Sequence, residues 1–313
     1  MDENYKLEIC AVVFGTDETI LNIKLEKDFI FCRKSLIPHV DNLDKIFNRE
    51  AFELRRDYET ARLDEKTLDV ICIYKNCDIK LRSEDAENFF DFLCDDSLKY
   101  LDDTIRKLRL FKESSLMFKR LSISLKSEEK QINETAFSSN YNAIIPIGEA
   151  LGSKIIKKFS CSNEETNILQ NDMRLISLPF ENLIVNSSFK YYDLSYHEDK
   201  CVSITLLITS LEILFLNNGK SKKKCLAKRV SVFLFAEKDD RLKCCSSIKD
   251  LYKKRSDFVH DGSDSNISDE DILLLRDYTR KCILKLNFEN ISKTKLINDL
   301  KKLVSKIDYF KEM

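Results

Sequence analysis

Residues 201–216 read CVSITLLITSLEILFL, the longest apolar run in the chain. A helix that is apolar almost all round is expected to be buried, so this run predicts the central helix of a helical bundle. A membrane span needs about 20 apolar residues, which this run does not reach. Asn217, Asn218 and Gly219 follow and are expected to end the helix. We therefore expect the second half of the chain to fold around residues 201–216.

The residues around this run also show helical spacing. A helix is expected to begin near Ser177, with Pro179 in its first turn, where a missing N–H does no harm. Ser268 is a good N-cap, and the acidic residues after it favour the positive end of the helix dipole. Amphipathic patterns occur near residues 225–236, 248–262, 268–288 and 296–307. The sequence therefore predicts an all-α domain over residues 164–313.

The first part of the chain, residues 1–163, mixes strand and helix patterns. Residues 7–13 alternate between apolar and mostly polar or small side chains, and residues 20–25 alternate again after a turn, which predicts a β-hairpin. Residues 69–74 predict another strand, and residues 84–111 predict a long helix. Residues 112–162 fit a loop or a pair of strands equally well. The predicted fold class is therefore α+β, with an N-terminal mixed α/β region followed by an all-α helical bundle.

The composition narrows the class of protein. The formal net charge is −1 over 313 residues, so any surface that attracts nucleic acid must be a local basic patch. The 11 cysteines are an odd number without a C-x-x-C pair, and the first residues do not resemble a secretory leader. We therefore expect free thiols in a cytoplasmic protein. The sequence has no H-E-x-x-H zinc motif and no Gly-rich phosphate loop, so no metal and no cofactor is expected.

Arg255 occupies a position where helical spacing calls for an apolar residue. It shares one predicted helix face with Ile248, Leu251, Tyr252 and Val259. A charge on a buried stripe is costly unless it is paired or used. Arg255 is therefore the first candidate for a functional side chain.

Glu212 is the expected partner of Arg255. Within residues 201–216 it forms a narrow polar stripe with Thr205 and Thr209. A buried carboxylate needs a cationic partner, and a guanidinium binds a carboxylate through two hydrogen bonds. The sequence leaves two interpretations of the pair: a purely structural ion pair, or a support that holds a reactive Arg255 in place.

His260 lies five residues after Arg255 and is one of three histidines. Residues five apart point about 140° apart on a continuous helix. A helix break between Val259 and Gly262 is expected to bring the imidazole beside the guanidinium. The alternative is a surface histidine at the helix C-terminus, where a positive charge interacts favourably with the helix dipole.

Residues 252–260, YKKRSDFVH, resemble the Arg-x4–6-His motif of the HEPN superfamily of ribonucleases. The flanks resemble the ApeA-like branch of that superfamily, in which Leu-Glu-x-Leu on a central helix precedes Tyr-x-x-Arg-Ser-x-x-x-His and a Gly. Residues 211–214 read LEIL, and Gly262 follows the motif. Many family members have Asn, Asp or His directly after the arginine. Here that residue is Ser256, and Asp257 comes next on another side of the predicted helix.

The resemblance implies a HEPN-type bundle that dimerises around the motif helix, so that two Arg–His pairs form one cleft. It implies a metal-independent endoribonuclease that leaves 2′,3′-cyclic phosphate ends. His260 then acts as general base or acid, Arg255 binds the scissile phosphate, and Glu212 holds Arg255. Tyr252, Ser256 and Asp257 are the supporting residues of this predicted site.

The resemblance also predicts partners. Proteins of this branch are associated with phage defence by abortive infection, which implies RNA as substrate, with tRNA as a candidate, and a phage-derived protein as trigger. Residues 1–163 are then a sensor or regulatory region, and no membrane partner is expected. RNA contacts are predicted from a local basic patch, whose alternative is an ordinary solvated lysine-rich face. The patch consists of Lys223, Lys224, Lys228, Arg229, Lys253 and Lys254.

Two other functions fit the same residues. One is a catalytically inactive HEPN scaffold that binds RNA, a nucleotide or a protein partner, and Ser256 after the arginine favours it. The other is the toxin of a toxin–antitoxin pair.

Overall fold

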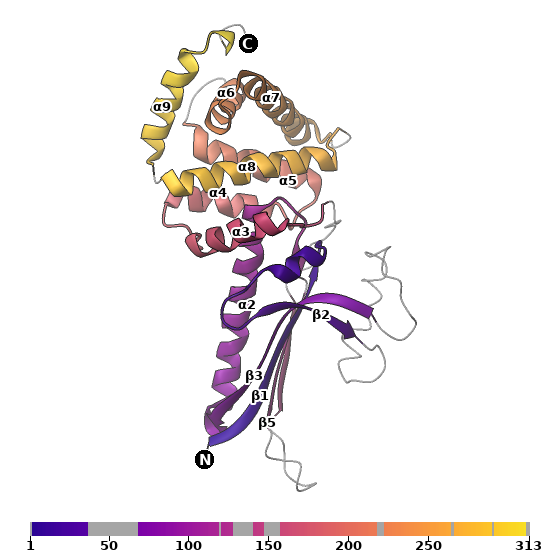
Figure 1. The fold of residues 1–313 in the computed structure, drawn as a ribbon. Helices are drawn as coiled ribbons and strands as arrows, with labels where there is room; N and C mark the ends of the chain where they lie inside the picture. The colour runs from indigo at the N-terminus through magenta and orange to yellow at the C-terminus, as the bar shows by residue number, and fades with distance from the viewer. Residues whose placement is uncertain are drawn as a thin grey trace. The chain divides into compact units, whose positions relative to one another are not determined.

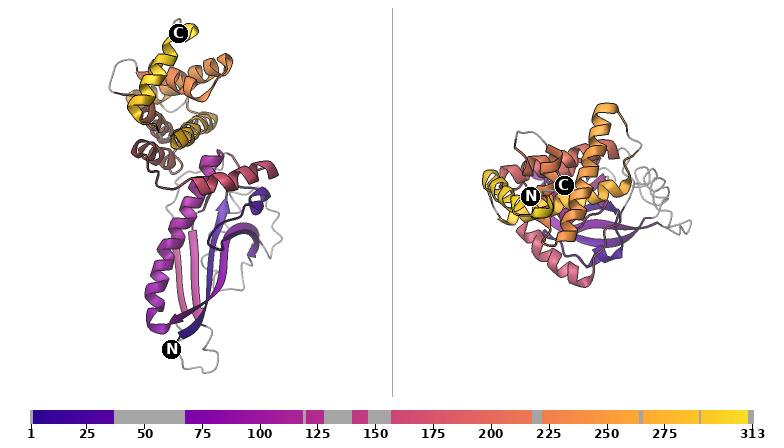
Figure 2. Two further views of the ribbon diagram at one scale, coloured as in Figure 1. Left: turned by 60° about the vertical axis from the view of Figure 1, so that its left-hand side comes forward. Right: turned by 90° about the horizontal axis from the view of Figure 1, so that it is seen from above.

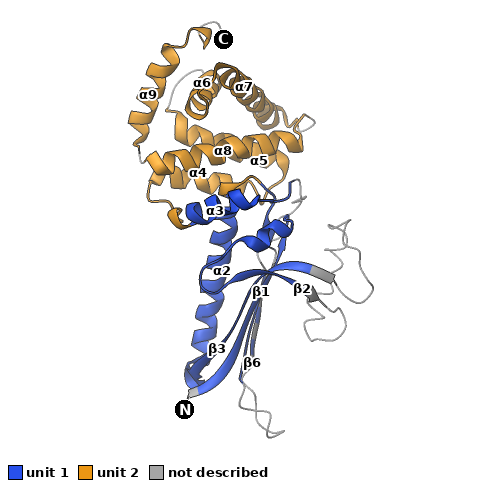
Figure 3. Cartoon of the chain, viewed as in Figure 1, with its two compact units in different colours: residues 1–109, 114–149, 154–173 blue, residues 110–113, 150–153, 174–313 orange. Residues whose placement is uncertain are grey.

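The structure is a computed structural model (Figure 1) that describes residues 2–36, 68–118, 120–127, 140–146, 157–217, 222–263, 266–289 and 291–310. The chain divides into two compact units, coloured separately in Figure 3. The first, or sheet unit, comprises Met1–Arg109, Ser114–Glu149 and Lys154–Met173. The second, or helical unit, comprises Leu110–Glu113, Ala150–Ser153 and Arg174–Met313.

The sheet unit is built around a six-stranded antiparallel sheet with the strand order β2-β3-β1-β5-β6. The central strand β1 pairs with β3 on one side and β5 on the other, and the short β4 pairs with its end. The strands are β1 (Asp2–Phe14), β2 (Ile30–Leu36), β3 (Leu68–Arg82), β4 (Met117–Phe118), β5 (Arg120–Ser127) and β6 (Asn140–Pro146).

The predicted hairpin between residues 7–13 and 20–25 is wrong. The second segment contains a 3₁₀ helix, η1 (Glu18–Asn22), instead of a strand. The Asp17 side chain caps this helix by accepting a hydrogen bond from the Thr19 N–H at 2.9 Å. The alternation came from Leu21, Ile23 and Leu25, but the residues that are buried are Ile20 and Ile23, whose spacing of three is that of a 3₁₀ turn.

A long helix, α2 (Ala86–Phe111), follows β3 and the short η2 (Ser83–Asp85). It runs along one face of the sheet (Figure 2), where the Phe90 ring lies 5.6 Å from the Tyr141 ring of β6. The Tyr100 ring stacks on Phe29 at 4.8 Å. The predicted helix over residues 84–111 is thus confirmed, and its buried side chains, such as Leu101 and Leu108, belong to the core of this unit.

The helix α3 (Asn163–Leu175) begins with a reciprocal cap. The Ser162 hydroxyl accepts from the Glu165 N–H, and the Glu165 carboxylate accepts from the Ser162 N–H. This capping box fixes the point at which the helical pattern begins, close to residue 164 as predicted.

The helical unit forms around α5 (Lys200–Phe215), the segment that contains the long apolar run. Ile204, Leu207, Ile208, Leu211 and Leu214 of this helix are completely buried. The prediction of a central buried helix is therefore confirmed. Around it lie α4 (Leu183–Leu194), α6 (Lys222–Leu234), α7 (Lys238–Asp261), α8 (Asp269–Glu289), α9 (Lys293–Ser305) and the short η3 (Asp308–Phe310).

The helix expected to begin near Ser177 begins later. The side chain of Asn182 accepts hydrogen bonds from the N–H groups of Ile184 and Val185, and α4 starts at Leu183. Pro179 precedes the helix and follows a cis peptide bond. Across the described ranges, no helix is long and apolar enough to cross a membrane.

Candidate functional site

The motif lies in the last turns of α7, where the helix leaves the core. Ile248 and Leu251 are buried, Arg255 is half-buried, and Val259 is 47% exposed. The apolar stripe predicted from the sequence therefore changes from core to surface at Arg255. The guanidinium lies at this transition, where its stem can be buried while its charged end stays near solvent.

Glu212 of α5 contacts the motif through Tyr252. The Tyr252 Oη donates a hydrogen bond to Glu212 Oε1 at 2.9 Å. The Arg255 Cζ lies 5.9 Å from the centroid of the Tyr252 ring, and the Arg255 Nε is buried without a hydrogen-bond partner. Among the described residues, no ion pair joins Glu212 and Arg255, so the predicted direct pair is wrong. Tyr252 lies one helical turn before Arg255 on the same face, and its hydroxyl contacts the Glu212 carboxylate in place of the guanidinium.

The three side chains still interact electrostatically. Burial, the hydrogen bond to Glu212 and the charge of Glu212 raise the pKa of Tyr252, while the Arg255 guanidinium opposes this shift. The phenol therefore stays protonated and remains a hydrogen-bond donor. The rest of the polar stripe on α5 is satisfied locally, since the hydroxyls of Thr205 and Thr209 donate to backbone carbonyls one turn earlier.

His260 is exposed in the last turn of α7. The helix continues to Asp261, and Gly262 ends it with φ 66°, its N–H donating to the Phe258 carbonyl at 2.9 Å. The expected break before His260 is therefore wrong. Within one chain, Arg255 and His260 point about 140° apart around the helix axis.

Ser256 and Asp257, the two supporting residues after the arginine, are half-buried on α7. They occupy successive positions, about 100° apart around the helix, so they face different directions. Together with Arg255 and His260 they spread the polar groups of the motif around the end of the helix rather than along one face.

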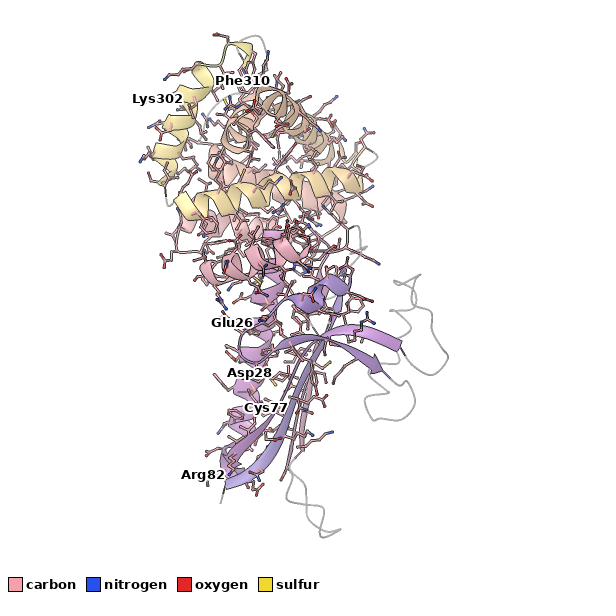
Figure 4. All side chains as sticks on the ribbon, in the orientation of Figure 1. Glu26, Asp28, Cys77, Arg82, Lys302 and Phe310 are labelled. Carbon is pink, nitrogen blue, oxygen red and sulfur yellow. The ribbon has the colours of Figure 1, made fainter. Side chains whose placement is uncertain are left out.

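The predicted basic patch divides into structural and surface residues. The Lys228 Nζ donates to the carbonyl of Phe310, which is labelled in Figure 4, and buried Arg229 donates to the Phe215 carbonyl. Lys254 forms ion pairs with Asp271 at 2.9 Å and Asp250 at 3.3 Å. These three cations stabilise the helical unit. The remaining members are exposed or half-buried on α6 and α7, namely Lys223, Lys224 and Lys253.

A second polar cluster was missed by the sequence analysis. The Tyr196 hydroxyl donates to Glu113 Oε2 at 2.9 Å, and the Tyr192 and Tyr196 hydroxyls lie 2.9 Å apart. The Arg276 guanidinium lies 4.0 Å from the Tyr196 ring centroid and also hydrogen-bonds to Ser195. Burial raises the pKa of Glu113 to about 7, although Arg276 opposes the shift. No sequence signal marked Glu113, because it follows the long helix in a stretch without periodicity.

Comparison of the chain with known protein families, with curated proteins and with solved structures found no match. The family resemblance therefore depends on the motif residues and their order alone. The described residues contain no group of three or more His, Cys, Asp or Glu side chains arranged to hold a metal ion.

Proposed function

We propose that the helical unit is a metal-independent endoribonuclease of the HEPN type, with an active cleft between two copies of the chain. The observation that carries the proposal is the composition of the end of α7. An exposed imidazole, His260, and a guanidinium supported by the Tyr252–Glu212 pair lie within two turns of one helix.

The angular separation of Arg255 and His260 is consistent with a site shared by two chains. In a two-fold symmetric interface, residue i of one copy contacts residue j of the other, and the reverse contact follows. Two α7 ends that pair in this way place each His260 beside the Arg255 of the other copy. Val259, 47% exposed between them in sequence, supplies apolar surface for such an interface.

The chemistry follows from these two side chains. Imidazole can both accept and donate a proton, so one His260 accepts the proton of a ribose 2′-hydroxyl and the other protonates the leaving 5′-oxygen. Arg255 binds the phosphate between them and stabilises the charge that develops on its oxygens. The products are a 2′,3′-cyclic phosphate and a free 5′-hydroxyl.

The charge distribution supports a polyanionic substrate. Residues 174–313 contain 26 Lys and Arg against 20 Asp and Glu, whereas residues 1–173 contain 26 against 33. The near-zero net charge of the chain thus conceals a basic helical part and an acidic part before it. An RNA substrate is expected to be attracted to the basic part, with tRNA as the first candidate, and binding is expected to weaken with salt.

As a biological role we propose an effector of abortive infection. A ribonuclease that damages its own cell has to be inactive until it is triggered, which gives the sheet unit the task of sensing a phage-derived protein. The alternative role is the toxin of a toxin–antitoxin pair, and an antitoxin encoded in an adjacent open reading frame would favour it.

Two observations favour an inactive scaffold as a second candidate. The unbroken α7 keeps Arg255 and His260 apart within one chain, and Ser256 stands where many family members have Asn, Asp or His after the arginine. A scaffold that binds RNA or a protein partner needs no pairing of these side chains.

Incubation of the purified protein with total tRNA in EDTA tests the proposal. Wild type is expected to produce fragments with cyclic phosphate ends, and His260→Ala is expected to lose at least about 100-fold of this activity, the usual contribution of a general acid or base. His197→Ala, which removes another exposed histidine, is the matched control and should cleave as wild type does. Circular dichroism and gel filtration check that fold and oligomeric state are unchanged. Full activity in His260→Ala refutes the site, and intact RNA at high wild-type concentration favours the scaffold.

A further inference from the structure

The sheet unit carries three cysteines on one face of its sheet. Cys10 lies on β1, Cys32 on β2 and Cys72 on β3, and these strands are neighbours in the order β2-β3-β1. Cys32 and Cys72 are direct register partners, whereas Cys10 is opposite Tyr74, two residues from Cys72. Side chains alternate between the two faces of a sheet, so the three thiols project from the same face.

The register fits a disulfide between β2 and β3. Opposite residues of antiparallel strands have Cα atoms about 4.5 to 5.5 Å apart, and disulfides join Cα atoms about 4.4 to 6.8 Å apart. Cys32 and Cys72 satisfy this condition without a change in strand pairing. Cys10 lies on the diagonal, and its side chain hydrogen-bonds with that of Cys72. Cys72 therefore has a thiol neighbour on each side.

The surroundings determine how fast these thiols react. Cys72 is buried, while Cys10 and Cys32 are half-buried and reach solvent. The hydrogen bond with Cys10, together with burial, raises the pKa of Cys72 well above its ordinary value, and burial raises the pKa of Cys32. The Lys34 ammonium, two residues from Cys32 on the same face, opposes both shifts. Because the thiolate is the reactive form, oxidation is expected to be slow at neutral pH and faster in alkaline solution.

We propose that Cys32 and Cys72 form a reversible oxidation site that closes a disulfide across β2 and β3 when the protein meets a peroxide, with Cys10 as the thiol that exchanges with it. The Cys32 thiolate attacks hydrogen peroxide, the O–O bond breaks, and a sulfenic acid and one water form. The Cys72 sulfur then attacks the sulfenic sulfur, and the second water leaves as the S–S bond forms. The two thiols lose two electrons and two protons, and the peroxide is reduced to two waters.

The disulfide has a structural consequence. β2 lies at the edge of the described sheet, where it pairs with β3. A covalent bond at Cys32–Cys72 holds this edge strand in register. We expect slower amide hydrogen exchange in β2 after oxidation, because the strand can no longer separate from β3 alone.

The test uses the full-length protein, treated with hydrogen peroxide in EDTA, alkylated and mapped by mass spectrometry after digestion. The expected product is about 2 Da lighter, the mass of two hydrogen atoms, contains a Cys32–Cys72 linked peptide pair, and reverts with dithiothreitol. Cys72→Ser is expected to abolish the bond. Cys77→Ser, on the opposite face of β3 and labelled in Figure 4, is the matched control and leaves it intact.

Two further results decide the proposal without requiring a cysteine variant to fold. In wild type, formation of the disulfide is expected to accelerate as the pH rises. Lys34→Met is expected to slow it several-fold at neutral pH, because the pKa values of the thiols rise when the positive charge that lowers them is removed. A disulfide that leaves out Cys72, an oxidised product that dithiothreitol does not reverse, or a pH-independent rate overturns the assignment.

Discussion

The helical unit contains the same three side-chain types in two clusters with different surroundings. In each cluster a tyrosine hydroxyl donates to a glutamate and an arginine lies near the tyrosine ring, at 5.9 Å for Arg255 and 4.0 Å for Arg276. Arg276 is buried and its guanidinium hydrogen-bonds to Ser195, whereas Arg255 is half-buried and its Nε has no partner. A buried guanidinium held by Ser195 through Nε and Nη2 indicates a structural role, whereas a half-buried guanidinium whose Nε has no partner, near the end of α7, indicates a binding role.

Removal of the two arginines gives the largest expected contrast. Arg276→Ala leaves the buried Ser195 carbonyl without its donor and removes the first of the two cations, Arg276 and Arg280, that act on Glu113, so it is expected to destabilise the helical unit by about 3–5 kcal/mol. Arg255→Ala is expected to cost less than about 1 kcal/mol, since no hydrogen bond is lost at Nε. Denaturant unfolding followed by circular dichroism measures both values, and equal destabilisation contradicts the division of roles.

The same pair of variants separates stability from activity. Arg255→Ala is expected to lower RNA cleavage by about 10²–10³-fold, the usual effect of losing one group that stabilises the transition state. The control is its normal unfolding curve. Cleavage that survives in folded Arg255→Ala assigns the arginine to another task.

Glu113 gives a pH test of the buried cluster. Its pKa in the folded protein is about 7, raised from the ordinary value near 4.5 chiefly by burial, and Tyr192, Tyr196, Arg276, Arg280 and Asp277 surround it. The folded state thus binds a proton more tightly than the unfolded chain, so this stabilisation is complete below about pH 4.5 and is lost as the pH rises through 7.

Across that pH range the free energy of unfolding is expected to fall by on the order of 3 kcal/mol. Glu113→Gln should remove this pH dependence while keeping an acceptor for the Tyr196 hydroxyl. Unfolding free energies at several pH values, for wild type and the variant, measure the difference. A pH dependence that Glu113→Gln leaves unchanged refutes the role of this carboxyl.

Tyr252→Phe tests the surface cluster with a smaller change. Loss of the hydrogen bond to Glu212 is expected to cost about 1 kcal/mol and to free the carboxylate for Arg255. We expect a several-fold decrease in RNA cleavage with the fold retained. Tyr196→Phe is the matched variant in the buried cluster, and it should cost more stability because it leaves Glu113 without its donor. A similar loss of stability in Tyr252→Phe and Tyr196→Phe would contradict the assignment of different roles to the surface and buried clusters.

The lysines near the motif give the smallest effects. Lys253→Ala is expected to remove about one phosphate contact, which lowers the slope of log K for RNA binding against log salt concentration by about one and leaves the stability unchanged. Lys254→Ala breaks the ion pair with Asp271 and is expected to cost about 0.5–1 kcal/mol, with little effect on binding. Titrations at several salt concentrations and unfolding curves distinguish the two lysines.

Helices could be predicted from the sequence because their signal is local. Residues 201–216 and 84–111 carry the spacing that places their apolar side chains in a core, and both form helices. The strand order could not be predicted, because β1 pairs with β3 and β5, which are separated from it in sequence by many residues. The alternation in residues 20–25 failed as a strand signal because the chain forms a 3₁₀ turn there, which buries Ile20 and Ile23, three residues apart.

The candidate site shows the same limit. Arg255 stood out because a guanidinium interrupts an apolar helix face, Glu212 because it is a carboxylate in an apolar run, and His260 because it is one of three histidines in the chain. Their contacts did not follow from this, since the choice between Tyr252 and Arg255 as partner of Glu212 depends on how α5 and α7 pack. Glu113 could not be found from the sequence, because its pKa depends on burial and on four side chains from two distant segments.

By itself, the sequence determined the helix-forming segments, the central position of α5 and the three side chains of the motif, because periodicity and the cost of a buried charge are properties of neighbours along the chain. Only the tertiary structure decided which groups meet: Tyr252 with Glu212, Tyr196 with Glu113, and Cys32 opposite Cys72. The physical reason is that hydrogen bonding, burial and strand register depend on distances between segments far apart in sequence, and folding alone sets those distances.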